Sequence, residues 1–347
     1  MSALTSHRRE KIIYQLLDDN EDLIGTLDGV TGGSLSWSIF QAVKSSGDIT
    51  YTKTGEIDWS AVRIKITYSA NGLDFPLGVY LPAITTWEHT DATVTLPIDL
   101  YDKLLIPQEA TLGRTLVIKA GSNIMQTVVA QIKALGENKI NLPTDSKKVS
   151  TDLVFEPADT ILKVVNTLLE SAGYLSLYCD PNGWYRAEPA IAASSRPIQH
   201  TFMPGDNCIH LPEFKLIRDW PAVPYRLTCV GRTNGDEPAD SASYTLDDVA
   251  PGSEAAAKAR RWKHRVDTDV EAATLEDLQA ICKRRLLLAA AVTRQTTVKH
   301  AYIPLALNQR VRFSDGGQDF SGTITQQRMS LDTPGALVET TIREVSA

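Results

Sequence analysis

The chain has 347 residues, of which 43% are hydrophobic, and its formal net charge is -7. Because a single hydrophobic core rarely extends past ~250–300 residues, two or three domains are expected. The acidic balance argues against a nucleic-acid-binding surface as the main activity, but it is compatible with a channel that nucleic acid passes without sticking. No hydrophobic run reaches the ~18 residues of a membrane span, and the segment Met1–Glu10 is polar, so we expect folding in a cytosol.

Residues 1–115 are predicted to form a first domain made of strands. Lys11–Leu17 and Leu23–Leu27 suit a hairpin, although a short helix over Lys11–Leu17 is the alternative. Further strands are predicted over Gly78–Leu81 and Thr93–Ile98, which brings the total to about seven and indicates an antiparallel sandwich or barrel. The alternating apolar residues are Leu35, Trp37, Ile39, Ile49, Tyr51, Val62, Ile64, Ile66 and Tyr68, with turns predicted at Gly32-Gly33, Gly47-Asp48 and Asn71-Gly72.

Residues 116–205 are predicted to form an inserted helix-hairpin α+β domain. Its first helix covers Ser122–Leu135, with Ser122 as the N-cap and Gly136 as the stop. A polar connection over 136–152 follows.

The second helix of this inserted domain has marked ends. Asp159 is the predicted cap, Pro157 lies just upstream, and Gly173 suits the left-handed residue that ends a helix. The Asp180–Gly183 turn then joins Tyr174–Tyr178 to Trp184–Ala187 in a hairpin. The apolar stripe consists of Ile161, Leu162, Val165, Leu168, Leu169 and Ala172, which recur at helical spacing.

Residues 206–347 are predicted to form a second β domain that contains a helix over 274–293. Thr274 caps this helix with Asp277 three residues later. Its expected buried residues are Leu275, Leu278, Ile281, Cys282 and Leu286. Strands are predicted over Phe214–Ile217, Tyr225–Val230, Thr297–Ile303, Gln309–Phe313, Phe320–Met329 and Leu337–Val345, with an exposed loop over Thr233–Asp240 and turns over Asp315–Gly317 and Asp332–Gly335. Both β-rich arms are therefore expected to be antiparallel.

No motif for catalysis, a cofactor or a metal stands in its required context, so no catalytic, cofactor-binding or metal-binding residue is predicted. His200 and His210 are candidates to approach Cys208 as metal ligands, but the spacing fits no standard zinc pattern. The cysteines Cys179, Cys208, Cys229 and Cys282 form no C-x-x-C pair and are expected to be buried free thiols.

Three other groups of residues can be interpreted either as structural or as functional. The basic run Arg260–Arg265, which contains Trp262, is either a contact for an acidic partner or phosphate, or a solvated surface. The carboxylates Asp58, Glu88, Asp91 and Asp99 are candidates for a glycosidase-type pair, but an acidic β protein shows such candidates by chance. The aromatics Trp59, Trp87 and Trp220 are either core residues or interface anchors.

The order of these elements resembles the tail hub, or baseplate hub, proteins of phages that infect Gram-positive bacteria. Asn308-Gln309 stands where many relatives carry Gly-Asp, which leaves the turn type open. The segments that carry the resemblance are Ala158–Leu169, Tyr178–Pro189, the helix from Thr274 to about Val292, the strand to Ile303-Pro304, Leu307–Phe313 and Gly322–Thr325.

The resemblance implies two antiparallel tube-like β-barrel domains in a mainly-β α+β chain. It implies a structural virion protein, not an enzyme, that forms a homotrimer with pseudo-sixfold symmetry at the tail tip. The ring would join the hexameric tail tube, or a distal tail protein, to a threefold tip and line the channel through which DNA exits. The tape measure protein and tip spike or fibre proteins are the other implied partners, with assembly in the host bacterial cytoplasm. The alternatives are a carbohydrate-binding or hydrolytic tail-tip protein acting on the host cell wall, and the hub of a phage-like contractile injection system.

Overall fold

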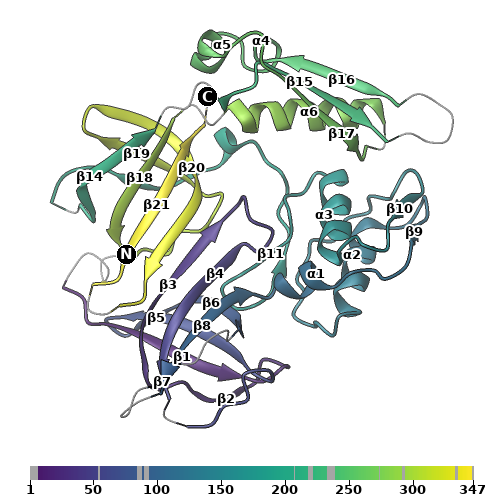
Figure 1. Ribbon diagram of the computed structural model, residues 1–347. Coiled ribbons are helices and arrows are strands. Elements are labelled where there is room, and N and C mark those ends of the chain that lie inside the picture. Colours follow the sequence, from purple (N-terminus) through teal and green to yellow (C-terminus); the bar gives the residue numbers. More distant parts are fainter. Residues whose placement is uncertain are drawn as a thin grey trace.

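A computed structural model describes residues 7–53, 55–83, 88–89, 94–206, 208–217, 222–232, 239–272, 274–290, 294–332 and 335–345. Strands predominate and the largest sheet has 14 of them, so the predicted mainly-β α+β class is confirmed. The buried apolar side chains gather in four clusters, which define four units of the molecule (Figure 1). The division into three domains at residues 115 and 205 stays a prediction.

The first strand unit consists of β1–β8, paired antiparallel in the order β2-β1-β5-β6-β8-β4-β3, with β7 beside β8. β1 and β2 form the predicted hairpin, and β1 also pairs along its whole length with β5. The alternative helix over Lys11–Leu17 therefore does not form. The strands are β1 (Glu10–Leu17), β2 (Leu23–Thr26), β3 (Val30–Ser38), β4 (Ser45–Thr52), β5 (Arg63–Ala70), β6 (Leu73–Ala83), β7 (Glu88–His89) and β8 (Val94–Asp102).

Two of the three turns predicted from glycines in this unit are wrong. Gly32-Gly33 lies inside β3 and Gly47-Asp48 lies inside β4, because these glycines allow the two backbones to approach closely. A Cβ at Gly33 would lie 2.2 Å from the carbonyl oxygen of Asp48, and one at Gly47 would lie 2.2 Å from that of Ser34. Asn71-Gly72 is the predicted turn between β5 and β6, with φ values of 52° and 81°.

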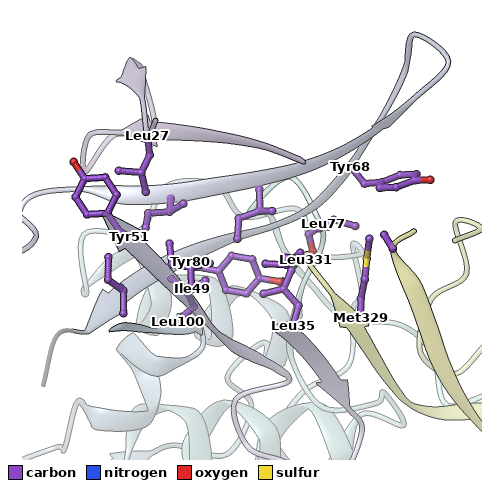
Figure 2. Packing of buried hydrophobic residues seen from close by; sticks show 14 of the residues in the cluster. Leu27, Leu35, Ile49, Tyr51, Tyr68, Leu77, Tyr80, Leu100, Met329 and Leu331 are labelled. Carbon is purple, nitrogen blue, oxygen red and sulfur yellow. Dashed lines mark hydrogen bonds between the residues drawn. The ribbon is translucent and has the colours of Figure 1, made fainter. Parts of the chain in front are cut away.

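The core of the first strand unit is built from alternate residues of its strands. Tyr80 is fully buried, and its hydroxyl shares a hydrogen bond of 2.9 Å with the Ser45 hydroxyl. Trp59 is partly buried and packs edge-on against Tyr51 with ring centroids 5.5 Å apart, so it lies at the margin of the core. Figure 2 shows that Met329 and Leu331, which come from the opposite end of the chain, lie in the same cluster.

The helical unit is built around α2 and α3, which pack against each other. Sequence patterns predicted these two helices and the short hairpin β11–β12, but not α1 or the pair β9–β10, which are too short to show a period. The elements are α1 (Leu105–Glu109), β9 (Leu116–Ile118), α2 (Ile124–Lys133), β10 (Leu153–Phe155), α3 (Ile161–Ser171), β11 (Tyr178–Cys179) and β12 (Tyr185–Arg186).

Both predicted N-caps of these helices are wrong by one residue. Asn123 accepts a hydrogen bond from the Gln126 amide, and Thr160 accepts one from the Lys163 amide. Asp159 instead accepts from the Glu156 amide and the Lys163 ammonium, which places it just outside the helix. Two adjacent residues can both cap at each site, and the sequence does not choose between them.

The three-stranded unit packs α6 on a small sheet with the order β16-β15-β17. Thr274 accepts a hydrogen bond from the Asp277 amide, which confirms the predicted cap. Leu278, Ile281, Cys282 and Leu286 are buried as predicted, but Leu275 is exposed. Most of the predicted loop Thr233–Asp240 lies outside the described residues. The elements are β15 (Arg226–Gly231), β16 (Ser241–Thr245), α4 (Leu246–Val249), α5 (Glu254–Lys258), β17 (His264–Val270) and α6 (Leu275–Ala290).

The second strand unit completes the molecule with the remaining strands. Most of its pairs are antiparallel, but β13 runs parallel to β19, as β15 does to β17 in the three-stranded unit. The alternation of apolar and polar residues shows which side chains of a strand face a core. It does not show whether the neighbouring strand runs parallel or antiparallel, so these two parallel pairs were not predicted. The elements are η2 (Ala193–Ser195), β13 (Ile198–Phe202), β14 (His210–Ile217), β18 (Gln295–Ala301), β19 (Arg310–Asp315), β20 (Gln318–Ser330) and β21 (Leu337–Glu344).

Candidate assembly surface

Strand β20 belongs to both strand units and fixes one relative to the other. Its first half pairs with β19, and its second half pairs with β3 in the register Gln326↔Ser38 to Ser330↔Ser34. Its residue Met329 and the following Leu331 are buried in the core of the first strand unit. We call this contact the seam. Because of it, the large sheet runs without a break through both strand units.

A cluster of buried charges attaches the helical unit to the first strand unit, and we call it the ionic junction. Glu21, Arg63 and Lys103 come from the first strand unit, where Lys103 directly follows its last strand, β8. Glu137 and Lys139 come from the helical unit. Arg63 Nη1 lies 2.9 Å from Glu21 Oε1 and Arg63 Nη2 lies 2.7 Å from Glu137 Oε1. Lys103 Nζ contacts both carboxylates, at 2.7 Å from Glu137 Oε2, and only 1% of its side chain is exposed.

Mutual pairing offsets the cost of burying these groups. Burial opposes ionisation of Glu137, but hydrogen bonds from Arg63 and Lys103 outweigh it and hold the pKa of that carboxyl below its usual value. Lys139 Nζ adds a contact of 2.8 Å to Glu21 Oε2. Glu21 has a left-handed backbone with φ of 64°, which is uncommon for a residue with a Cβ. The junction therefore holds this loop in a conformation that it would rarely adopt alone.

A second, more exposed set of charges joins the helical unit to the three-stranded unit. Arg285 of α6 donates to Glu170 of α3 at 3.0 Å and to Asp267 of β17 at 3.0 Å. Arg285 and Glu170 are 27% and 38% exposed, so solvent screens this contact more than it does the ionic junction. The four units are thus tied in sequence by a seam, a buried junction and a half-exposed bridge.

The main path of the large sheet ends at two free edges. Within the part of the chain that the structure describes, this path ends at β2 on one side and at β14 on the other, while β13 and β7 are further terminal strands on branches from it. Leu23 and Ile24 on β2 are more than half exposed. On β14 the register skips between His210 and Phe214, around Pro212, which has no N–H to offer a neighbour. An edge strand presents unpaired backbone groups that suit pairing with another chain.

The basic run predicted from the sequence lies at the surface of the three-stranded unit. Trp262 is 75% exposed, and the Arg260 guanidinium lies 5.7 Å from its ring centroid. Arg261 pairs with Asp247 at 3.0 Å and Arg265 pairs with Asp267 at 2.7 Å. Neighbouring carboxylates therefore neutralise part of the run, which favours the interpretation as a solvated surface.

The other candidate residues that the structure describes lie on different segments of the chain. Asp58 is exposed, and a hydrogen bond from Ser60 lowers its pKa. Asp99 lies on β8 opposite Asp48, whereas Asp91 and the side chain of Glu88 lie outside the described residues, as do Trp87 and Trp220. Cys208 does contact His210, but the described residues contain no group of three side chains suited to hold a metal. Among these residues, no helix is long and apolar enough to cross a membrane.

No motif in the sequence predicts the ionic junction, because its members are far apart along the chain. The one signal was Lys103, which directly precedes the apolar run Leu104–Ile106. A lysine at such a position is rarely buried without a carboxylate partner. The sequence therefore indicates that Lys103 pairs with carboxylates, but not which ones.

No protein-family model and no curated protein sequence matches the chain. Solved structures match it in fold. A tail protein from Neisseria meningitidis MC58 has a TM-score of 0.70 and 13% identity over 96% of this chain and 97% of that chain. The 43 kDa tail protein of prophage MuSo2 from Shewanella oneidensis has a TM-score of 0.66 and 16% identity over 97% and 98% of the two chains. A type VI secretion system component of E. coli, described as structurally similar to T4 bacteriophage tail proteins gp27 and gp5, has a TM-score of 0.52 and 11% identity over 92% and 74%. The chain therefore has the fold of phage tail proteins of the baseplate-hub type.

Proposed function

We propose that this chain is the hub of a phage tail tip, a structural virion protein that acts as a homotrimer. Three copies join the hexameric tail tube, or a distal tail protein, to the threefold tip and line the channel through which DNA leaves. The observation that carries the proposal is the seam, because it sets two strand-rich units of one chain side by side in a single sheet. Three copies then offer six strand-rich units around one axis, which is how a threefold ring can match a sixfold tube.

The free edges support assembly into a ring. β2 and β14 lie at opposite ends of one sheet, so an edge of one copy can meet the other edge of the next. Such head-to-tail contacts generate closed rings when the rotation closes. The exposed Leu23 and Ile24 add apolar surface to one of these edges.

The charge of the chain suits a channel that does not retain DNA. Each chain carries a net charge of -7, and three copies carry three times as much. A negative lumen repels phosphate and lets DNA slide through. In a filter assay the assembled ring should therefore fail to retain DNA at any salt concentration, and tight, salt-sensitive retention would contradict this part of the proposal.

We further propose that the chain is not an enzyme. Asp58 accepts a hydrogen bond from Ser60, Asp99 lies on β8 opposite Asp48, and the comparison proteins are tail components. Purified protein should therefore leave peptidoglycan intact, and release of soluble glycan or peptide fragments would favour the hydrolytic alternative. A glycan pull-down separates the carbohydrate-binding alternative in the same way.

The oligomeric state tests the proposal most directly. We expect light scattering to give the mass of three chains and negative-stain images to show a threefold ring with an open centre. Ile24→Glu on β2 should shift the mass toward one chain, because it places a charge at the free edge. Val117→Glu is the matched control, since Val117 is an exposed apolar residue on β9, away from both edges. A particle that remains a single subunit beside its tail partners would rule the proposal out.

The hub of a phage-like contractile injection system is the second candidate. It is supported by the similarity to the type VI secretion component of E. coli. The two candidates differ in whether neighbouring components form a sheath, which electron microscopy of the intact particle would show.

A further inference from the structure

A layer of buried polar side chains lies between the apolar cores of the two strand units, and we call it the polar layer. It consists of His300 on β18, Thr340 on β21 and Gln327 on β20, three strands that lie side by side (Figure 1). These residues are 0%, 0% and 8% exposed. Each is flanked along the chain by one residue from the core of the second strand unit and one from the core of the first. The flanking pairs are Val298 and Tyr302 for His300, Ile342 and Val338 for Thr340, and Ile324 and Met329 for Gln327.

The hydrogen bonds of the polar layer suit a neutral His300. Its Nδ1 lies 2.8 Å from the carbonyl oxygen of Ala301, which can only accept, so Nδ1 carries the hydrogen. Nε2 of the neutral ring therefore accepts from the Thr340 hydroxyl at 2.7 Å, and Gln327 Nε2 donates to the same hydroxyl at 3.2 Å. A proton on Nε2 would turn this nitrogen into a donor, and the Thr340 hydroxyl would then have to point its hydrogen away from the ring.

The surroundings of His300 oppose a positive charge on its ring. The Phe202 ring packs against it with centroids 5.0 Å apart, and an apolar core lies on either side of the layer. Burial lowers the pKa of His300 most, and positive charge on His200, His210 and Arg8 lowers it further. These three groups approach from β13, from β14 and from the segment before β1. The charges that shift the pKa of His300 are therefore all positive.

Two of these neighbours differ from His300 because each contacts a carboxylate. His210 Nε2 lies 2.9 Å from Asp315 Oδ2, and Arg8 Nη1 lies 3.8 Å from Glu10 Oε1. The hydrogen-bond partners of His300 are instead a hydroxyl and a backbone carbonyl, both uncharged. A proton on His300 would therefore place a charge in the interior that these two partners do not neutralise.

We propose that the polar layer is an acid-sensitive latch between the two strand units. While His300 is neutral, its bond with Thr340 and that of Thr340 with Gln327 link β18, β21 and β20 across the layer. When His300 takes a proton on Nε2, the first bond loses its donor and a charge lies between two apolar cores. The strands around the layer then open locally and admit water to the ring. All of these groups belong to one chain, so the latch does not depend on the proposed trimer.

The direction of the pH effect follows from the pKa of His300. Burial lowers it to about 4 in the closed layer, whereas an imidazole in an opened segment has a pKa of about 6.5. Between these values the closed layer binds fewer protons than the opened one, so the latch is strongest above about pH 6.5 and weakens as pH falls toward about 4. The equilibrium constant for opening should rise about 20-fold from about pH 7 to about pH 5. Burial also lowers the pKa of His200, which acts in the same direction.

Amide hydrogen exchange of the full chain tests the latch, with peptides that cover β18 and β21. Protection factors, corrected for the intrinsic pH dependence of exchange, should fall about 20-fold from about pH 7 to about pH 5. His300→Gln keeps an acceptor for the Thr340 hydroxyl but takes no proton, so its loss of protection should be at least about fivefold smaller. Global denaturation is a poorer readout, because Asp102 of β8 has a pKa raised by burial to about 7 and changes stability in the opposite direction over this range.

A matched variant and a second measurement complete the test. His264→Gln is the control, since His264 is exposed on β17 of the three-stranded unit, and its loss of protection in β18 and β21 should equal that of the unmodified chain. Exchange of the imidazole C2 hydrogen, followed by peptide mass in the unmodified chain, reports the titration of His300 itself and serves as the test if His300→Gln does not fold. We expect its midpoint to lie well below about pH 6.5. A midpoint near that value, protection that does not fall in acid, or an equal fall in the unmodified chain and His300→Gln would overturn the proposal.

Discussion

The first strand unit meets its two neighbours in opposite ways. At the seam it shares a ladder of backbone hydrogen bonds and an apolar core with the second strand unit. At the ionic junction it meets the helical unit through buried charges that pair mainly with each other, with one further hydrogen bond from Lys103 to the Gly183 carbonyl oxygen. An apolar contact weakens in proportion to the surface lost, whereas a buried ion cluster fails when one member is removed and the rest remain charged. We therefore expect the junction to specify the position of the helical unit more strictly than the seam specifies that of the second strand unit.

Removal of one cation from the ionic junction should cause the largest loss in the free energy of unfolding. Lys103→Met leaves Glu21 and Glu137 buried with fewer partners, and we expect a loss of about 3–5 kcal/mol in the free energy of unfolding. Chemical denaturation measures this loss. The control is Lys119→Met, because Lys119 pairs with Asp152 while 73% exposed and should change little. If both variants lost the same stability, the distinction between buried and surface charges would not hold here.

Truncation at the seam should come next. Met329→Ala removes a fully buried side chain that β20 contributes to the core of the first strand unit, at a cost of about 2–5 kcal/mol. The same denaturation experiment measures it, and Met203→Ala is the control, since Met203 is 56% exposed. Met329→Leu should recover most of the loss because it keeps the volume. If Met329→Leu were as unstable as Met329→Ala, side-chain volume would not be what stabilises the seam.

The pH dependence of Asp102 sharpens the contrast, because this carboxyl directly precedes Lys103 yet is not paired with it. Burial raises the pKa of Asp102 to about 7, while hydrogen bonds from the Leu104 and Ser45 amides oppose the shift. The folded chain therefore binds a proton that the unfolded chain, with a pKa of about 3.9, has lost, and stability falls as pH rises between these values. The expected slope is about 1.4 kcal/mol for each pH unit.

Asp102→Asn isolates this contribution from those of other carboxyls. The substitution loses one acceptor, so it should be the less stable chain at about pH 5. The stability gap should then narrow by about 2–3 kcal/mol by about pH 7, because only the aspartate becomes charged. Denaturation series at several pH values measure the gap. A gap that stays constant with pH would mean that Asp102 titrates near its ordinary value.

The half-exposed bridge should have the smallest effect. Glu170→Gln weakens the contact with Arg285, and because both side chains are partly solvated we expect a loss of about 1 kcal/mol. Added salt should reduce the difference, unlike that of Lys103→Met. Glu156→Gln, on the exposed surface of the helical unit, serves as the control. If Glu170→Gln lost as much free energy of unfolding as Lys103→Met, this bridge would contribute as much stability as the buried junction.

Most strands were predictable from the sequence because one face of each is buried. The alternation of Val62, Ile64 and Ile66 predicted β5, but it also implied that Arg63 faces solvent. The structure buries Arg63 because the helical unit covers that side of β5. The alternation of apolar and polar residues along a strand shows which face packs on the core. It does not show whether another unit covers the opposite face.

The union of the two strand units was not predictable. β20 was predicted as a strand from Phe320 to Met329, and it is one, but pairing with β3 joins segments almost 300 residues apart. Loop closure over such distances leaves no local pattern in the sequence. The prediction that all four cysteines are buried is wrong for Cys208, which is exposed, and Cys179 is only partly buried.

Strand β20 has 13 residues, which corresponds to a length of about 44 Å. A mechanical load applied to either strand unit is therefore transmitted along the covalent backbone of a single strand into the other unit. Bending between them would require several ladder hydrogen bonds to β3 or β21 to break together. We expect a tip built from this chain to open by displacement of whole subunits, with each subunit moving as a stiff element.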